Sequence, residues 1–278
     1  MSPAPKHILV LDNKRRELQT QIQKIQNERN VKSREIGRIK AQGGDPIDFT
    51  REVKEYKNTL SKLEDQENKL ADELNHLLMN LPNLIDEDLP IGNEEQNLEV
   101  RKWGEIRKFD FTPKDHVDLG EKIDGIDFST AVKLAGSRFV LLKGQLSKLE
   151  RALASFMLDM HADEFGYTEI SPPILVNEEI MKGTGQLPKF EDDLFKTTDN
   201  RWLIPTAEVP LTNLVSNTII PFESLPLRFT AFTQCFRSEA GAAGRDTRGM
   251  IRNHQFSKVE LVSICSSDQS KNEHERMT

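Results

Sequence analysis

Apolar residues recur at alternating spacings of three and four through residues 11 to 80. Gly43, Gly44 and Pro46 interrupt the pattern and divide it into two halves. Arg29 and Lys32 occupy positions of the apolar seam in the first half, where they could meet an acid such as Glu67 in the second half or extend their charged ends outward to water. The pattern predicts an antiparallel two-helix hairpin, on the order of 45 Å long. The seam positions are Leu18, Ile22, Ile25, Ile36 and Ile39, then Val53, Tyr56, Leu60, Leu63, Glu67, Leu70, Leu74 and Leu77.

The pattern changes after residue 80. Residues 81–99 are rich in proline, asparagine and acidic residues, and Pro82 and Pro90 prevent the helix from continuing. We therefore expect a helical arm over residues 1–80, a linker over residues 81–99 and a second domain over residues 100–278.

A further helix is predicted in the second domain. It should run to about Glu164, where Gly166 supplies a stop, and Tyr167–Ile170 should then form a strand. Its apolar positions again step by three and four, which gives a wide apolar face. They are Phe139, Leu142, Leu146, Leu149, Leu153, Phe156 and Met160.

Two runs of β-type residues, Leu227–Glu239 and Ile251–Cys265, flank a loop rich in glycine and arginine, and they predict a long antiparallel hairpin. Side chains alternate between the faces of a strand, so charged and aromatic groups gather on one face. That face suits an anionic, ring-bearing ligand with an amino group, because arginine matches phosphate and an aromatic ring stacks on a base. The alternative is a charged, solvated hairpin with one aromatic ring in the core. The shared-face residues are Arg237, Glu239, Arg252, His254, Phe256, Lys258 and Glu260.

Composition limits the class of protein and its compartment. The 278 residues suffice for about two domains, and the net charge of −7 argues against a generally basic nucleic-acid binder. Cys235 and Cys265 lack a nearby histidine cluster, which predicts free thiols in a reducing compartment rather than a zinc site or a disulfide. No signal peptide or membrane-spanning run is evident, so we expect a cytoplasmic protein with no membrane partner.

The charge of the predicted arm is nevertheless uneven. Residues 14 to 40 carry nine basic and three acidic residues, whereas Arg51–Glu73 carries five basic and seven acidic residues. A basic stripe on a protruding rod suits contact with RNA phosphates. The alternative is the solvated surface of a coiled coil.

The hairpin also carries a resemblance to a known family. FRSEAG (Phe236–Gly241) and RNHQFSKVE (Arg252–Glu260) resemble motif 2 of class II aminoacyl-tRNA synthetases, in the form found in seryl-tRNA synthetases. The arm sequences LDNKRREL and ERNVKSREIG and the loop GTGQLPKF are similar to the same family, and the helix and strand before Pro172 resemble its dimer-forming motif 1. The resemblance implies an α+β fold, with an N-terminal antiparallel two-helix coiled-coil arm followed by a partial class II synthetase antiparallel-sheet catalytic domain.

The resemblance further implies roles for individual residues. A serine site would be lined by Thr206, Ala207, Glu208 and Glu260. In extended chain Thr206 and Glu208 would face the same way, although Thr206 suits a helix N-cap equally well. ATP would be bound by Arg237, Ser238, Glu239, Arg252, Asn253 and Phe256, with Arg237 as the catalytic residue and Phe256 stacked on adenine. Contacts with tRNA would come from Arg29, Lys32, Arg34, Arg38, Arg245 and Arg248, and no metal ligand is assigned.

The activity implied by this resemblance is that of a serine–tRNA ligase. The serine carboxylate would attack the α-phosphate of ATP, accompanied by Mg²⁺, and a homodimer would pass the seryl group to tRNA(Ser), with tRNA(Sec) as a further candidate acceptor. No match to motif 3 of the family is found, so we expect a fragment that is catalytically poor alone. The alternatives are a non-catalytic tRNA-binding synthetase-like protein and a coiled-coil scaffold, which differ in whether RNA binding weakens with salt.

Overall fold

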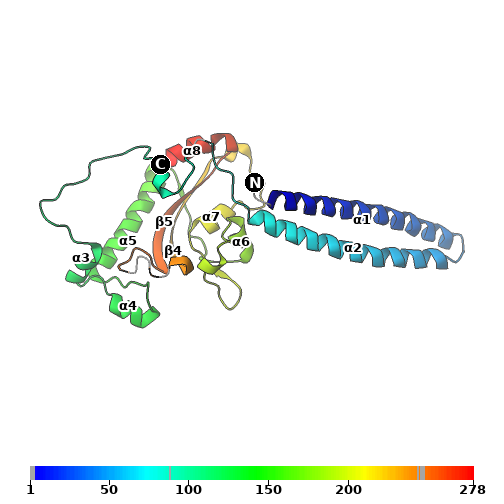
Figure 1. The fold of residues 1–278 in the computed structure, drawn as a ribbon, viewed down its shortest axis with the longest axis horizontal. Coiled ribbons are helices and arrows are strands. Elements are labelled where there is room, and N and C mark those ends of the chain that lie inside the picture. The colour runs from blue at the N-terminus through cyan, green and yellow to red at the C-terminus, as the bar shows by residue number, and fades with distance from the viewer. Residues whose placement is uncertain (1–3, 88, 243, 245–247) are drawn as a thin grey trace. The chain divides into compact units, whose positions relative to one another are not determined.

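The computed structural model describes residues 4–87, 89–242, 244 and 248–278. The chain divides into two compact units, Met1–Gln96 and Asn97–Thr278. The first unit is helical and the second combines helices with a small sheet, so the predicted α+β class is confirmed (Figure 1). No helix in the described part of the chain is long and apolar enough to cross a membrane.

The first unit is the predicted helical hairpin, formed by α1 (Ala4–Ala41) and α2 (Ile47–Met79), with a short 3-10 turn at Glu94–Gln96. Leu60 and Leu74 of the predicted seam are buried, and so is Leu11, which the seam did not include. Gly43 turns the chain with a φ of +76°, a conformation that glycine adopts without steric cost.

Polar residues of the seam find partners inside the hairpin. Glu67 accepts a hydrogen bond from Arg15 Nε at 2.8 Å, and the Arg15 guanidinium is the main reason why the pKa of Glu67 lies below its usual value. Lys32 pairs with Glu52 at 3.2 Å and lies over the ring of Phe49. Lys32 therefore meets an acid of the second helix, as one alternative required, although that acid is Glu52, and Glu67 meets Arg15 instead.

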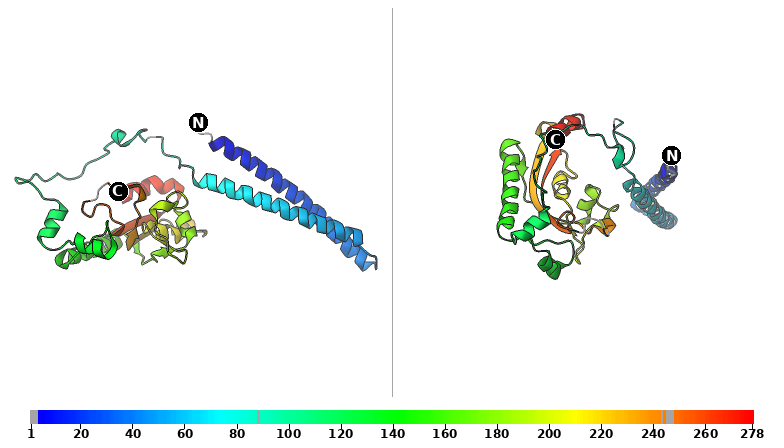
Figure 2. Two further views of the ribbon diagram at one scale, coloured as in Figure 1. Left: turned by 60° about the horizontal axis from the view of Figure 1, so that its bottom comes forward. Right: turned by 60° about the vertical axis from the view of Figure 1, so that its left-hand side comes forward.

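Helices of the second unit surround its sheet, and Figures 1 and 2 show α5 on one face with α6 and α7 on the other. In chain order the helices are α3 (His116–Lys122), α4 (Phe128–Ala135), α5 (Gly144–Asp159), α6 (Glu178–Gly183), α7 (Glu208–Asn213) and α8 (Ser270–Met277). A π-helical turn, Met160–Glu164, extends α5. Short 3-10 turns lie at Glu191–Asp193, Phe222–Ser224, Ala240–Ala242 and Ser267–Gln269.

Helix α5 begins later than its apolar spacing predicted. The predicted start was Phe139, but the helix begins at Gly144 because the preceding backbone bonds elsewhere. Leu141 O accepts from Asp127 N at 2.9 Å, and Lys143 N donates to Gly125 O at 2.8 Å. These bonds tie the chain before α5 to the start of α4.

The main sheet contains the predicted hairpin. Its strand order is β1 (Thr168–Glu169), β4 (Leu227–Phe236), β5 (Gln255–Ile264), with β1 parallel and β5 antiparallel to β4. Both hairpin strands are shorter than predicted, since the chain leaves the ladder after Phe236 and joins it only at Gln255. One cause is that Ser238 N donates to Asp193 O at 2.9 Å instead of pairing across the hairpin.

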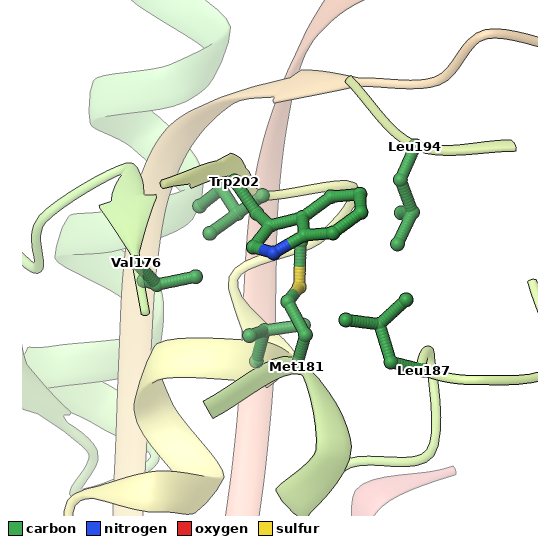
Figure 3. Close-up of a cluster of buried hydrophobic side chains, with 7 residues drawn as sticks. Val176, Met181, Leu187, Leu194 and Trp202 are labelled. Carbon is green, nitrogen blue, oxygen red and sulfur yellow. The ribbon is translucent and has the colours of Figure 1, made fainter. Parts of the chain in front are cut away.

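A second, two-stranded sheet holds the main apolar core. Strands β2 (Leu175–Val176) and β3 (Trp202–Leu203) pair antiparallel. Figure 3 shows Trp202 packed among the side chains of a buried cluster, which also includes Ile204 and Val209. The remaining members of the cluster are Val176, Met181, Leu187 and Leu194.

A smaller cluster fixes the start of α7 against the hairpin. Ala207 and Leu211 of this region pack on Ala231 of β4 and Val262 of β5, and three of these four side chains are fully buried. The packing brings residues 206–208 next to the strands that carry the candidate ligand-binding groups.

An ion cluster attaches α8 to the sheet. Glu273, whose side chain is 10% exposed, accepts hydrogen bonds from Arg228 Nε, Arg276 Nη2 and Ser263 Oγ at 2.8 to 2.9 Å. Arg276 also donates to the Tyr167 hydroxyl at 2.6 Å. The hydrogen bonds from Arg228, followed by those from Arg276, hold the pKa of Glu273 far below its usual range.

We expect the Glu273→Ala substitution to lower the free energy of unfolding by about 3 kcal/mol at pH 7, because it leaves two arginines unpaired. A carboxyl group with a lowered folded-state pKa stabilises the fold above its unfolded pKa of about 4.3, and the contribution is lost as the pH falls below that value. Urea unfolding at pH 7 and pH 3 should therefore show a smaller difference at pH 3. Glu275→Ala, which removes an exposed ion pair with Arg101, should cost less than about 1 kcal/mol. Equal effects of the two variants would contradict the expectation.

Candidate active site

The hairpin places an arginine and an aromatic ring together where its strands end. Arg237 directly follows β4, and Phe256 is the second residue of β5, opposite Cys235. The Arg237 guanidinium carbon lies 5.2 Å from the Phe256 ring centroid, and Nε donates to Pro205 O at 3.3 Å. Cys235 is a free thiol whose pKa is raised by burial.

The second arginine of the hairpin is held by a carboxylate. Arg252 Nη1 donates to Glu239 Oε2 at 2.9 Å, and Glu239 has a φ of +53°. Ser238 Oγ donates to Asp192 O at 2.5 Å, which ties this turn to the chain after the GTGQLPKF loop. Asn253 is buried and lines a cavity beside Phe256, and within the described structure its Oδ1 is an acceptor that has no hydrogen-bond partner.

Residues 206–208 and the middle of β5 form a second polar group. Thr206 Oγ1 and Glu260 Oε2 share a hydrogen bond, and Glu208 N donates to the same oxygen at 3.2 Å. Lys258 Nζ lies 2.7 Å from both Thr206 Oγ1 and Glu260 Oε2. The carboxylate of Glu260, the hydroxyl of Thr206 and the ammonium of Lys258 therefore lie within hydrogen-bonding distance of one another.

One interpretation of the sequence required residues 206–208 to be extended, but the structure shows that they are not. Ala207 has helical dihedral angles and α7 begins at Glu208, with Thr206 Oγ1 accepting from Glu208 N at 3.3 Å. A helix start therefore describes the backbone better than extended chain does, although the N-cap residue is Ala207, one position after Thr206. Thr206 and Glu208 nevertheless line one cavity.

Two adjoining cavities meet at the hairpin. One of about 730 Å³ is lined by Asn253 and Phe256, and one of about 490 Å³ by Thr206 and Lys258. Both cavities are also lined by Arg237, Glu239 and Arg252. Arg237 and Glu239, which follow β4, therefore border both a cavity suited to an aromatic base and a cavity suited to a small zwitterion.

The sequence assigned no role to Lys258 or to the loop around Gln186. Because Lys258 shares a strand face with Phe256 and Glu260, the alternation of side chains could have indicated that it belongs to the site. Its partner Thr206 lies in a distant segment, so their pairing could not be predicted from the strand. Gln186 and Phe190, from the GTGQLPKF loop, line the smaller cavity.

The remaining predicted residues are not among the described residues that line these two cavities. Arg248 pairs with Asp118 at 2.7 Å and approaches Asp115 at 3.4 Å, and Arg245 lies outside the described residues. Arg29, Lys32, Arg34 and Arg38 belong to α1 in the first unit. No group of three metal-ligating side chains gathers among the residues that the structure describes.

Comparison with known proteins identifies both units. The family model of the seryl-tRNA synthetase N-terminal domain matches residues 3–85, and that of the tRNA synthetase class II core domain (G, H, P, S and T) matches residues 189–278. A serine–tRNA ligase from Brucella canis is 53% identical over 280 residues, an alignment that covers 100% of this chain and 66% of that protein.

Solved structures give the same result. The crystal structure of seryl-tRNA synthetase from Pyrococcus horikoshii complexed with ATP matches 98% of this chain and 66% of that one, with 33% identity and a TM-score of 0.83. A cytoplasmic serine–tRNA ligase from Naegleria fowleri in complex with AMP shares the fold at 24% identity, 98% and 62% coverage and a TM-score of 0.77. The two family models and the similarity to these relatives therefore place this chain in the seryl-tRNA synthetase family.

Proposed function

We propose that this chain carries the ATP and serine sites of a serine–tRNA ligase, which forms seryl-adenylate and transfers the seryl group to tRNA(Ser). The observation that carries the proposal is the position of Arg237 between the two cavities. Phe256 and Asn253 offer a stacking surface and an acceptor on one side, and Thr206 and Glu260 offer partners for an ammonium on the other. An α-phosphate bound at Arg237 would lie within reach of an amino acid in the smaller cavity.

In the proposed reaction the protein supplies position and charge rather than a nucleophile. The serine carboxylate attacks the α-phosphate, pyrophosphate leaves, and Arg237 stabilises the charge that develops on phosphate oxygens. Glu260 and Thr206 would bind the substrate ammonium, which requires Lys258 to move or to share its partners. A buried partner for the serine hydroxyl would reject alanine by a factor of up to roughly 10⁴, while the size of the cavity would exclude threonine.

We further propose that Mg²⁺ enters with ATP, since Mg²⁺ is commonly held by substrate phosphates and only one or two carboxylates. A homodimer and a cytoplasmic location also belong to the proposal. The apolar face of α5 suits a dimer contact, because Leu149, Leu153 and Phe156 are each about half exposed in the single chain.

The proposal is tested by binding of a sulfamoyl analogue of seryl-adenylate to the chain, measured by calorimetry, with alanyl and threonyl analogues as comparisons. Intermediate analogues bind tightly because they fill both subsites at once. We expect the seryl analogue to bind at least about 100-fold more tightly than the alanyl analogue. Equal affinity for the three analogues, or no binding of any, would refute the assignment to serine.

The arm offers a separate test with tRNA(Ser). Arg34 and Arg38 are exposed on α1, and each phosphate contact contributes close to one unit to the slope of log K against log salt. Arg34→Ala combined with Arg38→Ala should therefore weaken tRNA binding and lower that slope by about 2, measured by filter binding at several salt concentrations. The matched variant changes Lys54 and Lys57, exposed on α2, and should leave the slope almost unchanged. A similar loss in both variants would show non-specific attraction instead of a stripe on α1.

A further inference from the structure

The segment between α4 and α5 contains an arginine in an uncommon backbone conformation. Arg138 has a φ of +63°, in the left-handed region that residues with a Cβ rarely adopt. Glycine adopts this region freely, so an arginine here carries a conformational cost that glycine would not. None of the roles proposed above uses Arg138.

Arg138 holds the residues that precede β5 from two sides. Its Nη1 donates to the main-chain oxygen of Arg252 at 3.3 Å, across 114 positions of sequence. Its own main-chain oxygen accepts from the main-chain nitrogen of His254 at 2.9 Å. Asn253, between these two attachments, is 6% exposed. One residue therefore fixes the backbone on both sides of Asn253.

The held segment is linked to the catalytic arginine. His254 O accepts from Arg237 N at 2.9 Å, and His254 Nδ1 lies 2.9 Å from Arg237 O. The His254 ring also packs against Phe139, the neighbour of Arg138, with ring centroids 5.4 Å apart. A displacement of residues 252–254 would therefore move Arg252, Asn253 and the main chain of Arg237 together.

We infer that Arg138 is a positioning residue of the nucleotide cavity, which sets the backbone that presents Arg252 and Asn253. It lines an adjoining cavity of about 380 Å³ and is absent from the lining of the larger cavity, so it acts through its neighbours and not by touching the nucleotide. The inference rests on the proposed binding of ATP in that larger cavity. Because the side-chain and main-chain attachments are separate, they can be tested separately.

Arg138→Gly is the informative variant, since it removes the guanidinium while leaving the left-handed backbone accessible. We expect ATP binding, measured by calorimetry, to weaken about tenfold, equivalent to about 1.4 kcal/mol. The ratio of affinities for the seryl and alanyl analogues should stay within about twofold, because the serine cavity is lined by other segments. Arg138→Lys, which keeps a cationic donor, should recover part of the ATP affinity.

Asn217→Gly is the matched control, because Asn217 is an exposed residue with a φ of +54° outside the cavities described above. Amide hydrogen exchange of His254 gives a second readout that does not depend on ATP. It should accelerate in Arg138→Gly and stay unchanged in Asn217→Gly. Unchanged ATP affinity and unchanged exchange in Arg138→Gly would overturn the inference. If the parent chain fails to bind ATP, the proposed function fails, while the exchange rate still decides whether Arg138 holds the segment.

Discussion

Replacing Arg237 by alanine is expected to weaken ATP binding about 100-fold, the largest effect that we predict for the nucleotide side of the site. The guanidinium lies over Phe256 and borders both cavities, so its loss removes the charge proposed to meet the α-phosphate and one wall of the base-stacking site. Hydrogen bonds to charged groups contribute roughly 1.5–3 kcal/mol each, which corresponds to about 10- to 150-fold in affinity. Calorimetric titration with ATP measures the effect directly.

The matched control for Arg237→Ala is Arg201→Ala. Arg201 pairs with Asp199 at 2.6 Å on the surface, with its side chain 52% exposed. Such an exposed pair contributes at most about 1 kcal/mol to stability, and it borders neither cavity. ATP affinity should therefore match that of the parent chain. An Arg237→Ala chain that melts normally and binds ATP with parental affinity would exclude Arg237 from the nucleotide site.

The Glu260→Gln substitution is expected to weaken binding of the seryl-adenylate analogue about 100-fold while leaving ATP affinity within about twofold. It removes the negative charge on which Thr206, Lys258 and the Glu208 amide converge. The substrate ammonium then loses its charged partner, and Lys258 is left without one, which is costly at a partly buried site. Titration with the analogue and with ATP separates the two effects.

Glu223→Gln, at an exposed position in the turn before β4, is the control for a change from carboxylate to amide. It should alter neither titration. The two variants should differ in the titration with ATP, which is impaired in Arg237→Ala and nearly unchanged in Glu260→Gln, where only binding of the seryl-adenylate analogue is weakened. A parallel loss of both affinities in Glu260→Gln would mean that Glu260 supports the hairpin as a whole and does not define a serine subsite.

Local periodicity accounts for the parts of the fold that were predicted well. The seam of the arm repeats over many turns, and each apolar side chain meets its neighbours three and four positions away, so the helices follow from short-range sequence. The alternation along the hairpin likewise placed Phe256, Lys258 and Glu260 on one face, which the register of β4 and β5 preserves.

Long-range hydrogen bonds account for the differences. The spacing of apolar residues predicted that α5 begins at Phe139. The helix begins at Gly144 instead, because the residues before it form hydrogen bonds with the chain around Asp127. The hairpin strands are shorter than predicted for the same reason, because Ser238 N donates to Asp193 O and His254 N donates to Arg138 O. Backbone groups take whichever partner the packed structure brings to them, and the sequence pattern of one segment does not show the other.

Residues a few positions apart were sufficient to predict the two-helix arm, the strands of the hairpin and the side chains that share its face. Which groups meet across distant segments could be learned only from the packed fold. In the folded chain Lys258 donates to Thr206, and α7 begins at Glu208, where extended chain was one possibility. Arg138 bonds to Arg252, which precedes β5. The physical reason is that periodicity fixes the direction of a side chain within its own element, whereas its partner is chosen by the packing of that element against the rest of the unit.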